Sequence, residues 1–407
     1  MSQTLTPTEV ARRVVAEAIW APSVHNTQPW RFTVHDHQIG VHADPSRRLE
    51  IADPDGREML ISCGAAVFTA RLALRSLGWI PEVDLLSDAR DPMLVARLGW
   101  RRRAPVGDYE WRLFGHVRSR RTHRGAFDLE PLAPGLLAAM RTGAARDGAP
   151  LRVVADDGRR ASLAAAIQLA ERAAQLDGGR IHELARWAPP PGSPRADGVP
   201  PTAYPARPEH TSPDFPGRDF AHGRGWGLPP LTTASAARST GVVALLTTRH
   251  DRPQDWVATG QALQRILLTA STCGAAVAMH SQPLELPWLR RVIRLQFSDG
   301  AYPHLILRFG NVTQVAASIR RDVADVLTLP ADELPLSAHS AAVGRHQGWS
   351  TDFGVAPLSL CKNRDLRPWE EADRGHGMTN YDERSPGAVR AASDPARTYS
   401  SRRERNR

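Results

Sequence analysis

Hydrophobic residues recur along the chain with two spacings, one typical of helices and one typical of strands. Apolar and small residues follow a helical spacing from Gly64 to Gly78 and again from Gly260 to Gly274, which predicts two helices with buried faces. Phe32 and Val34 alternate with polar neighbours, which predicts a half-buried strand. The run from Pro303 to Gly310 is apolar enough for a buried strand. Mixed helices and strands predict an α+β fold.

The two predicted helices belong to an internal repeat. An aspartate, a glycine nine residues later and a second glycine fourteen residues after that occur twice, as Asp55, Gly64 and Gly78 and as Asp251, Gly260 and Gly274. The strand that begins at Trp30 has a counterpart that begins at Leu151, and each follows a proline. We therefore predict two related halves, residues 1–115 and 116–335.

The second half carries an insertion. Pro29 precedes Asp55 by 26 residues, whereas Pro150 precedes Asp251 by 101, so about 75 residues are added. The added segment is helix-like from Ala161 to Ala188, and then becomes rich in Pro, Gly, His and Arg. Long loops in compact domains are often lids, so we expect a lid at about 189–240, with disorder as the alternative. Five aromatic residues favour a packed segment: Trp187, Tyr204, Phe215, Phe220 and Trp226. After about residue 335 the periodicity fades, and 336–407 is predicted to be a disordered tail or a frameshifted terminus.

Composition excludes several classes of protein. The chain has 407 residues, 42% of them hydrophobic, which is enough for a sizeable core. Lys362 is its single lysine, so a Schiff-base lysine or a P-loop lysine in the first 360 residues is ruled out. The net charge is +9, but acidic residues are interspersed among the arginines, so we expect no nucleic-acid partner.

Metal sites, disulfides and membrane insertion are not predicted either. The three cysteines are too scattered for a disulfide framework or a cysteine zinc site. The stretch from His35 to His37 offers two imidazoles, but no further ligand cluster follows, so we interpret it as the end of a surface hairpin. The start of the chain lacks a signal-peptide pattern and no apolar run approaches the ~20 residues of a membrane span. We expect a cytoplasmic protein.

The segment from Ala21 to Phe32 is the strongest functional motif. It places small and amide-bearing residues in a turn beside a large aromatic ring. Asn26 and Gln28 each offer a donor and an acceptor, as is needed to recognise a flat polar heterocycle, and Ser23 can face an anion or a hydroxyl. The alternative is an ordinary connection between a helix and a strand.

This segment resembles the signature PS-x-x-N-x-Q-P-W-x-F of the FMN-dependent nitroreductases. The resemblance spans about residues 8 to 330 and is closest to the Acg-like branch, which is internally duplicated and carries a lid. It implies a nitroreductase-like fold, FMN as cofactor and NAD(P)H as a reductant. It also implies that Ser23, Asn26 and Gln28 contact the cofactor.

A second motif resembles the family's arginine signature. The segment from Ser119 to Gly125 resembles the R-R-S-x-R motif that holds the FMN phosphate, and clustered arginines suit bidentate bonds to phosphate. The implied ligands are Arg120, Arg121, Arg124 and Thr122, the last in place of serine. A solvated basic turn is the alternative.

In this family FMN lies at a dimer interface, with the loop from one subunit and the arginine motif from the other. Here both motifs lie in one chain, so its two halves would mimic the dimer. The resemblance therefore implies one FMN per chain and a monomer. The related site is expected to be degenerate, because Arg12 and Arg13 lie in a plain helix and the segment 145–150 has no amide side chains.

Two further segments match the family. The stretch from Ser281 to Leu286 corresponds to the segment along the flavin's central ring, which implies contacts from Pro283, Glu285 and Leu286. The family often has glycine where Leu286 stands. Arg320 and Arg321 fall where the family places a second basic pair for the phosphate, and an exposed helix start is the alternative for Arg320.

The resemblance implies an oxidoreductase that passes hydride from NAD(P)H through flavin N5 to a nitroaromatic or quinone-type acceptor. No separate catalytic residue and no metal is expected, because FMN carries the chemistry. The insertion leaves a second function open, in which a lid-blocked flavin is stored or sequestered with little turnover.

Overall fold

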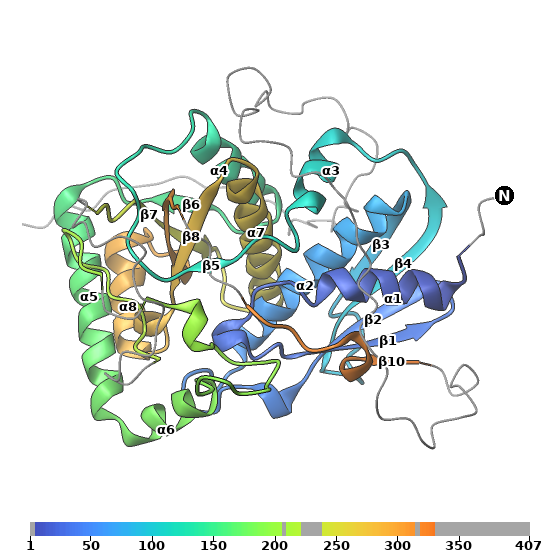
Figure 1. Ribbon diagram of the computed structural model, residues 1–407, viewed down its shortest axis with the longest axis horizontal. Coiled ribbons are helices and arrows are strands. Elements are labelled where there is room, and N and C mark those ends of the chain that lie inside the picture. Colours follow the sequence, from blue (N-terminus) through green and yellow to red (C-terminus); the bar gives the residue numbers. More distant parts are fainter. Residues whose placement is uncertain (1–4, 206–208, 221–237, 314–317, 330–407) are drawn as a thin grey trace, which may run out of the picture. The chain divides into compact units, whose positions relative to one another are not determined.

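Residues 5–205, 209–220, 238–313 and 318–329 are described in the computed structural model (Figure 1). They contain two five-stranded sheets, each with its own helices. The tail predicted at 336–407 and parts of the predicted lid, including Trp226, lie outside the described residues.

The first sheet is built from the amino-terminal half and one short strand from the end of the described chain. Its order is β10-β1-β2-β4-β3, and β10 runs parallel to β1. The strands are β1 (Trp30–His35), β2 (Gln38–Ala43), β3 (Trp79–Leu85), β4 (Leu94–Arg103) and β10 (Leu327–Thr328), and the helices are α1 (Pro7–Ala18), α2 (Arg57–Ser76) and α3 (Asp108–Gly115).

Local sequence explains two of these elements. Thr6 and Glu9 form a capping box at the start of α1, and Pro7 fits the first helical position. In β1, Phe32 and Val34 are buried while Arg31 is exposed, which confirms the predicted alternation. His35 and the next two residues are exposed at the turn between β1 and β2, as the hairpin interpretation predicts.

The second sheet has the order β5-β8-β9-β7-β6. Its strands are β5 (Thr122–His123), β6 (Leu151–Val153), β7 (Val242–Thr248), β8 (Ala275–His280) and β9 (Tyr302–Asn311). The helices of this half are α4 (Leu136–Arg146), α5 (Asp157–Leu176), α6 (Gly178–Arg186), α7 (Pro253–Thr272) and α8 (Pro287–Phe297). Short 3-10 helices in the described chain are η1 (Val24–Asn26), η2 (Pro45–Arg47), η3 (Pro201–Ala203), η4 (Gln282–Leu284) and η5 (Val323–Asp325).

The strand order repeats between the halves. The series β1-β2-β4-β3 and the series β6-β7-β9-β8 follow the same path along the chain, and every neighbouring pair within them is antiparallel. The long helix comes after the second strand in both, as α2 and as α7. This topology is the arrangement that the sequence repeat predicts.

Helices cover the sheets in layers. One hydrophobic cluster joins α1 and α2 to the first sheet. The second sheet is covered on both faces, because Leu305 and Leu307 of β9 pack with α4 and α7 while Ile306 packs with α5 and α8. Successive residues of a strand point to opposite faces of the sheet, so the apolar residues of β9 contribute to the hydrophobic clusters on both faces.

The two halves meet where α2 crosses α7, in the middle of the molecule (Figure 1). A Cβ on Gly64 would lie 2.9 Å from the carbonyl carbon of Val257. A Cβ on Gly260 would lie 2.8 Å from the backbone nitrogen of Ala65 and 2.9 Å from the Cα of Gly64. Only glycine allows this backbone contact, and the two glycines are the pair that the sequence repeat aligns.

Helix α2 is long and apolar enough to cross a membrane, which the sequence analysis did not anticipate. Its most apolar 18-residue stretch is 78% buried within the protein. In this protein α2 is therefore the core helix of the first half.

We predict that Gly260→Ala destabilises the protein by about 1–3 kcal/mol or more, because the new methyl group would press on the backbone of α2. Urea unfolding of the variant and the parent measures the difference. The matched control is Gly115→Ala at the end of α3, where a Cβ meets nothing within 4 Å, so no loss is expected. Equal stability of the Gly260→Ala variant and the parent would contradict a close helix crossing.

Candidate functional site

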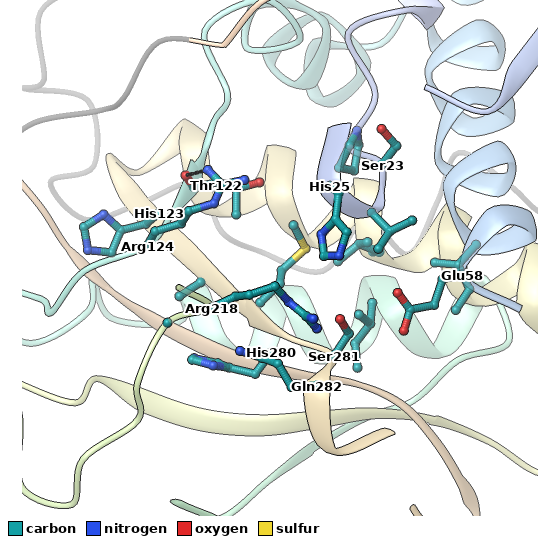
Figure 2. Close-up of a pocket in the computed structure, with 18 of the residues that line it drawn as sticks. Ser23, His25, Glu58, Thr122, His123, Arg124, Arg218, His280, Ser281 and Gln282 are labelled. Atoms are coloured by element: carbon teal, nitrogen blue, oxygen red, sulfur yellow. Dashed lines mark hydrogen bonds between the residues drawn. The ribbon is translucent and has the colours of Figure 1, made fainter. Parts of the chain in front are cut away.

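Two adjoining cavities lie between the halves of the chain. The larger one has about 840 Å³ of empty space, part of it open to solvent, and is shown in Figure 2. The smaller one, here called the arginine cavity, has about 390 Å³. Pro22, Ser23, Thr122 and Arg124 line both, so a single ligand can extend from one cavity into the other.

Strand pairing places the arginine motif at this junction. In β5, Thr122 is aligned with Val277 of the parallel strand β8. Arg120 and Arg121 precede this short strand and Arg124 follows it, so all three side chains reach the arginine cavity. The loop between α1 and β1 forms the opposite wall.

Arg320 joins the other three arginines from a segment about 200 residues later in the chain. Burial, helped by Arg121 and Arg124, lowers the pKa of Arg120 to about 9. Burial also lowers the pKa of Arg124 to about 10, and burial and the other three guanidinium groups lower the pKa of Arg320. Within the described residues, none of the four forms an ion pair with an aspartate or glutamate.

Several donors in this cluster are unpaired. Nε and Nη1 of Arg120 and Nε of Arg320 are buried and have no hydrogen-bond acceptor among the described residues. Burying an uncompensated charge is costly, and a buried donor without an acceptor adds to that cost. The arginine cavity therefore suits an anion, because the described residues place no carboxylate against these arginines.

The facing loop has an unusual backbone. His25, Asn26 and Gln28 have positive φ angles of 46°, 54° and 51°, a region that residues other than glycine rarely occupy. Such conformations persist where surrounding contacts impose them, and they concentrate at functional sites. Here the backbone N–H of Gln28 donates to Ser23 Oγ at 2.9 Å.

The two amides of this loop bind the protein itself. Asn26 donates to the carbonyl of Gly198 at 2.9 Å and accepts from Arg320 at 3.1 Å. Gln28 is fully buried, donates to Ala196 O at 2.8 Å, and accepts from the backbone of Arg321 at 2.9 Å. These bonds position Arg320 and the insertion. Asn26 also lines the arginine cavity, whereas Gln28 lies outside both cavities. The sequence analysis expected both amides to face a ligand.

The described part of the insertion covers both cavities. Ala188, Val199, Ala203, Tyr204 and Phe220 form a small hydrophobic cluster of their own. Residues 198–200 and Ala203 line the arginine cavity, while Gly217, Arg218 and Phe220 line the larger one. The described segments are packed, in line with the lid interpretation.

Comparisons with known proteins fit this geometry. No protein-family model matches the chain. The protein named "Putative NAD(P)H nitroreductase Rv3131" of Mycobacterium tuberculosis is 33% identical over 331 residues, covering 80% of this chain and 93% of the relative. The chain belongs to the nitroreductase superfamily, in its Acg-like branch.

Two further similarities were found. The M. tuberculosis protein named "Putative NAD(P)H nitroreductase acg" is 27% identical over 337 residues, covering 82% of this chain and 99% of the relative. The solved nitroreductase with bound FMN from Desulfitobacterium hafniense is 17% identical with a TM-score of 0.29, covering 53% of this chain and 97% of that one.

Five of the predicted site residues lie outside both cavities: Gln28, Pro283, Glu285, Leu286 and Arg321. Pro283 is buried beside the larger cavity, and Leu286 packs with the cluster under α5 and α8. Glu285 points away to Arg180, Arg218 and Ser281. Arg321 donates to the carbonyl of Asp325. In place of Pro283, Glu285 and Leu286, the neighbouring residues Ser281 and Gln282 line the larger cavity.

The residues expected at the related site in the other half lie on α1 and around the end of α4. Arg12 and Arg13 are exposed on α1. Asp147 forms a buried ion pair with Arg265 at 2.6 Å, and Gly148 lies beside Ala258 of α7. The expected degeneracy of this site stays a prediction. No group of three or more metal-ligating side chains occurs among the residues described.

The sequence analysis missed Glu58, which lines the larger cavity from the first turn of α2 (Figure 2). Burial, followed by the charge of Glu285, raises the pKa of Glu58 to about 8. Burial likewise raises the pKa of Asp53 to about 6. The signal in the sequence was a charged pair, Arg57 and Glu58, at the start of an otherwise apolar helix.

We predict that Glu58→Gln makes stability less dependent on pH. In the unfolded chain Glu58 loses its proton near its ordinary pKa of 4.5, while the folded protein keeps it until about pH 8. The unfolded state therefore binds fewer protons in that window, so the free energy of unfolding falls as the pH rises through it. Urea unfolding at several pH values measures the slope. An unchanged slope in the variant would show that Glu58 ionises normally.

Proposed function

We propose that the protein is an FMN-dependent NAD(P)H oxidoreductase, with the FMN phosphate in the arginine cavity and the flavin ring in the larger one. Four arginines carry this proposal. Arg120 is buried, the other three are half-buried, and none has an acidic partner among the described residues. A phosphate dianion supplies the missing negative charge and accepts bonds from the unpaired N–H groups. The names of the relatives support NAD(P)H as the reductant.

The larger cavity suits a flat ring with polar edges. Ile61, Leu263 and Leu305 give it apolar walls, while Ser23, Ser281 and Gln282 provide hydrogen-bonding groups. Such a mixture is typical of cofactor sites. When bound, FMN supplies a two-electron carrier between NAD(P)H and an acceptor. The protein residues bind it, orient it and exclude water.

We propose a nitroaromatic or quinone-type small molecule as the acceptor, one FMN per chain, and a cytoplasmic monomer. The two motifs lie in one chain, and both contribute to the lining of the arginine cavity. A second subunit is therefore not needed to complete the site.

A second function, FMN sequestration, is favoured by one observation. Gly217, Arg218 and Phe220 of the insertion line the larger cavity, where they take up space beside the ring site. A nicotinamide ring must stack on the flavin to deliver hydride. If the insertion stays closed, the flavin is held without turnover.

Anaerobic mixing with excess NADPH separates the two functions. We expect prompt bleaching of the visible flavin absorbance, because the cavity is partly open and NAD(P)H is the reductant of the family. Stopped-flow absorbance measures the rate, and heat-released FMN per chain gives the stoichiometry. Persistent colour with a normal FMN content would favour sequestration over turnover.

Arg121→Ala tests the phosphate site. Among the described residues the Arg121 side chain bonds to carbonyl groups of its own turn and lies over the Trp20 ring, 4.9 Å from its centre. Its loss should therefore disturb the fold little. Loss of a charge-assisted contact of about 1.5–3 kcal/mol should lower FMN affinity roughly tenfold to a hundredfold. Riboflavin, which lacks the phosphate, should be much less affected.

Fluorescence titration of the apoprotein with both flavins measures these affinities. The control is Arg118→Ala, because Arg118 is an exposed arginine that pairs with Glu17 outside the cavities. Equal losses for FMN and riboflavin would show that Arg121 acts on folding.

A further inference from the structure

A group of buried charges lies at the end of the larger cavity opposite the arginine cavity. Glu58 is 4% exposed, and Figure 2 shows its carboxyl, Arg218 and Ser281 turned toward the same space beside His25. Glu58 comes from the first half, Arg218 from the insertion and Ser281 from the turn after β8. Three separate parts of the chain thus bring polar groups to one point of the cavity.

Carboxyl groups outnumber cations in this group. The charged members are Asp53, Glu58, Glu171 and Glu285 on one side and Arg57, Arg180 and Arg218 on the other. Arg290 of α8 also faces Glu58, but it is paired with Asp251 at 2.8 Å. If all were ionised, a buried negative charge would remain, and buried carboxyls avoid this cost by holding a proton.

The hydrogen bonds identify the carboxyl that holds the proton. Glu285 is bonded to Arg180, Arg218 and Ser281. Asp53 accepts two backbone N–H groups at the start of α2, at 2.9 and 2.8 Å, and such bonds favour the ionised form.

Two carboxyls remain, those of Glu171 and Glu58. Glu171 accepts the backbone N–H of Asp219 at 3.1 Å, and its Oε2 has no partner among the described residues. Of the four carboxyls, however, only that of Glu58 lines the larger cavity, and its support for a negative charge is weak. Among the described residues its carboxyl is bonded to Arg57 alone, at 3.1 Å. Arg57 in turn is shared with the carbonyls of His304 at 3.0 Å and Leu284 at 3.3 Å. The raised pKa of Glu58 agrees with this assignment.

We infer that Glu58 is the proton donor for reduction of the acceptor in the larger cavity. This inference rests on the proposed function. A quinone-type acceptor takes a hydride from the reduced cofactor and a proton from the Glu58 carboxyl, which gives the hydroquinone. The carboxyl O–H bond breaks, an O–H bond forms on the acceptor oxygen, and the carboxylate regains its proton from water. General acids of this kind are effective when their pKa lies near the working pH.

Infrared spectroscopy of the FMN-loaded protein tests the protonation state directly. We expect a protonated-carboxyl C=O band that disappears as the pH is raised through about 8, and that is absent from Glu58→Gln. If Glu58→Gln does not fold, Glu58→Asp should shift the same band. No such band in the parent protein would overturn the inference, whether or not the flavin turns over.

Separate half-reactions test the role in catalysis. After anaerobic reduction by NADPH, the protein is mixed with p-benzoquinone and flavin reoxidation is followed by stopped flow. Glu58→Gln should slow reoxidation on the order of a hundredfold to ten-thousandfold, with reduction by NADPH nearly unchanged. Glu110→Gln, which alters another arginine-paired carboxyl outside both cavities, should leave both steps as they are.

The outcomes distinguish the inference from the proposed function. If NADPH does not reduce the flavin, the proposed function is wrong, and the protein is reduced with dithionite so that the quinone step can still be compared. If reoxidation is equally fast in the parent and in Glu58→Gln, Glu58 does not donate the proton.

Discussion

Backbone contact between α2 and α7 is the constraint on which the rest of the structure depends. Gly64 and Gly260 let the two helices approach until their main chains touch. This fixes the halves against each other, so the loop after α1 faces β5 across a gap of ligand size. A wider crossing would separate Ser23 from Thr122 and divide the site, which belongs to neither half alone.

The site has opposite electrostatic character at its two ends. Arg120, Arg124 and Arg320 gather in the arginine cavity without acidic partners, so that end is completed by an anion. At the other end carboxyls exceed cations, and Glu58 retains a proton. A ligand with a phosphate at one end and a redox-active ring at the other matches both. Burial of these groups on folding thus produces both the affinity for an anion and the raised pKa of Glu58.

The insertion links the two ends. Gly198 accepts from Asn26 near the arginine cavity, while Arg218 pairs with Glu285 beside the larger one. The strained loop is held partly by these contacts, which explains why Asn26 and Gln28 are turned into the protein. Their amides fix the walls of the site, and Asn26 also lines the arginine cavity.

The sequence by itself determined the repeat, the α+β class and the two motifs, because periodicity, glycine spacing and dense local signatures are local properties of a chain. It placed Arg320 with Arg120 only through the family resemblance. It could not show that Leu286 packs under α5 and α8 or that Glu58 faces the cavity. Those facts depend on contacts between residues far apart in the chain, such as Asn26 and Arg320, which are separated by 294 positions. Which side chains stay unpaired, and which carboxyl keeps its proton, was decided only by tertiary burial, because the energy of a charge depends on everything packed around it.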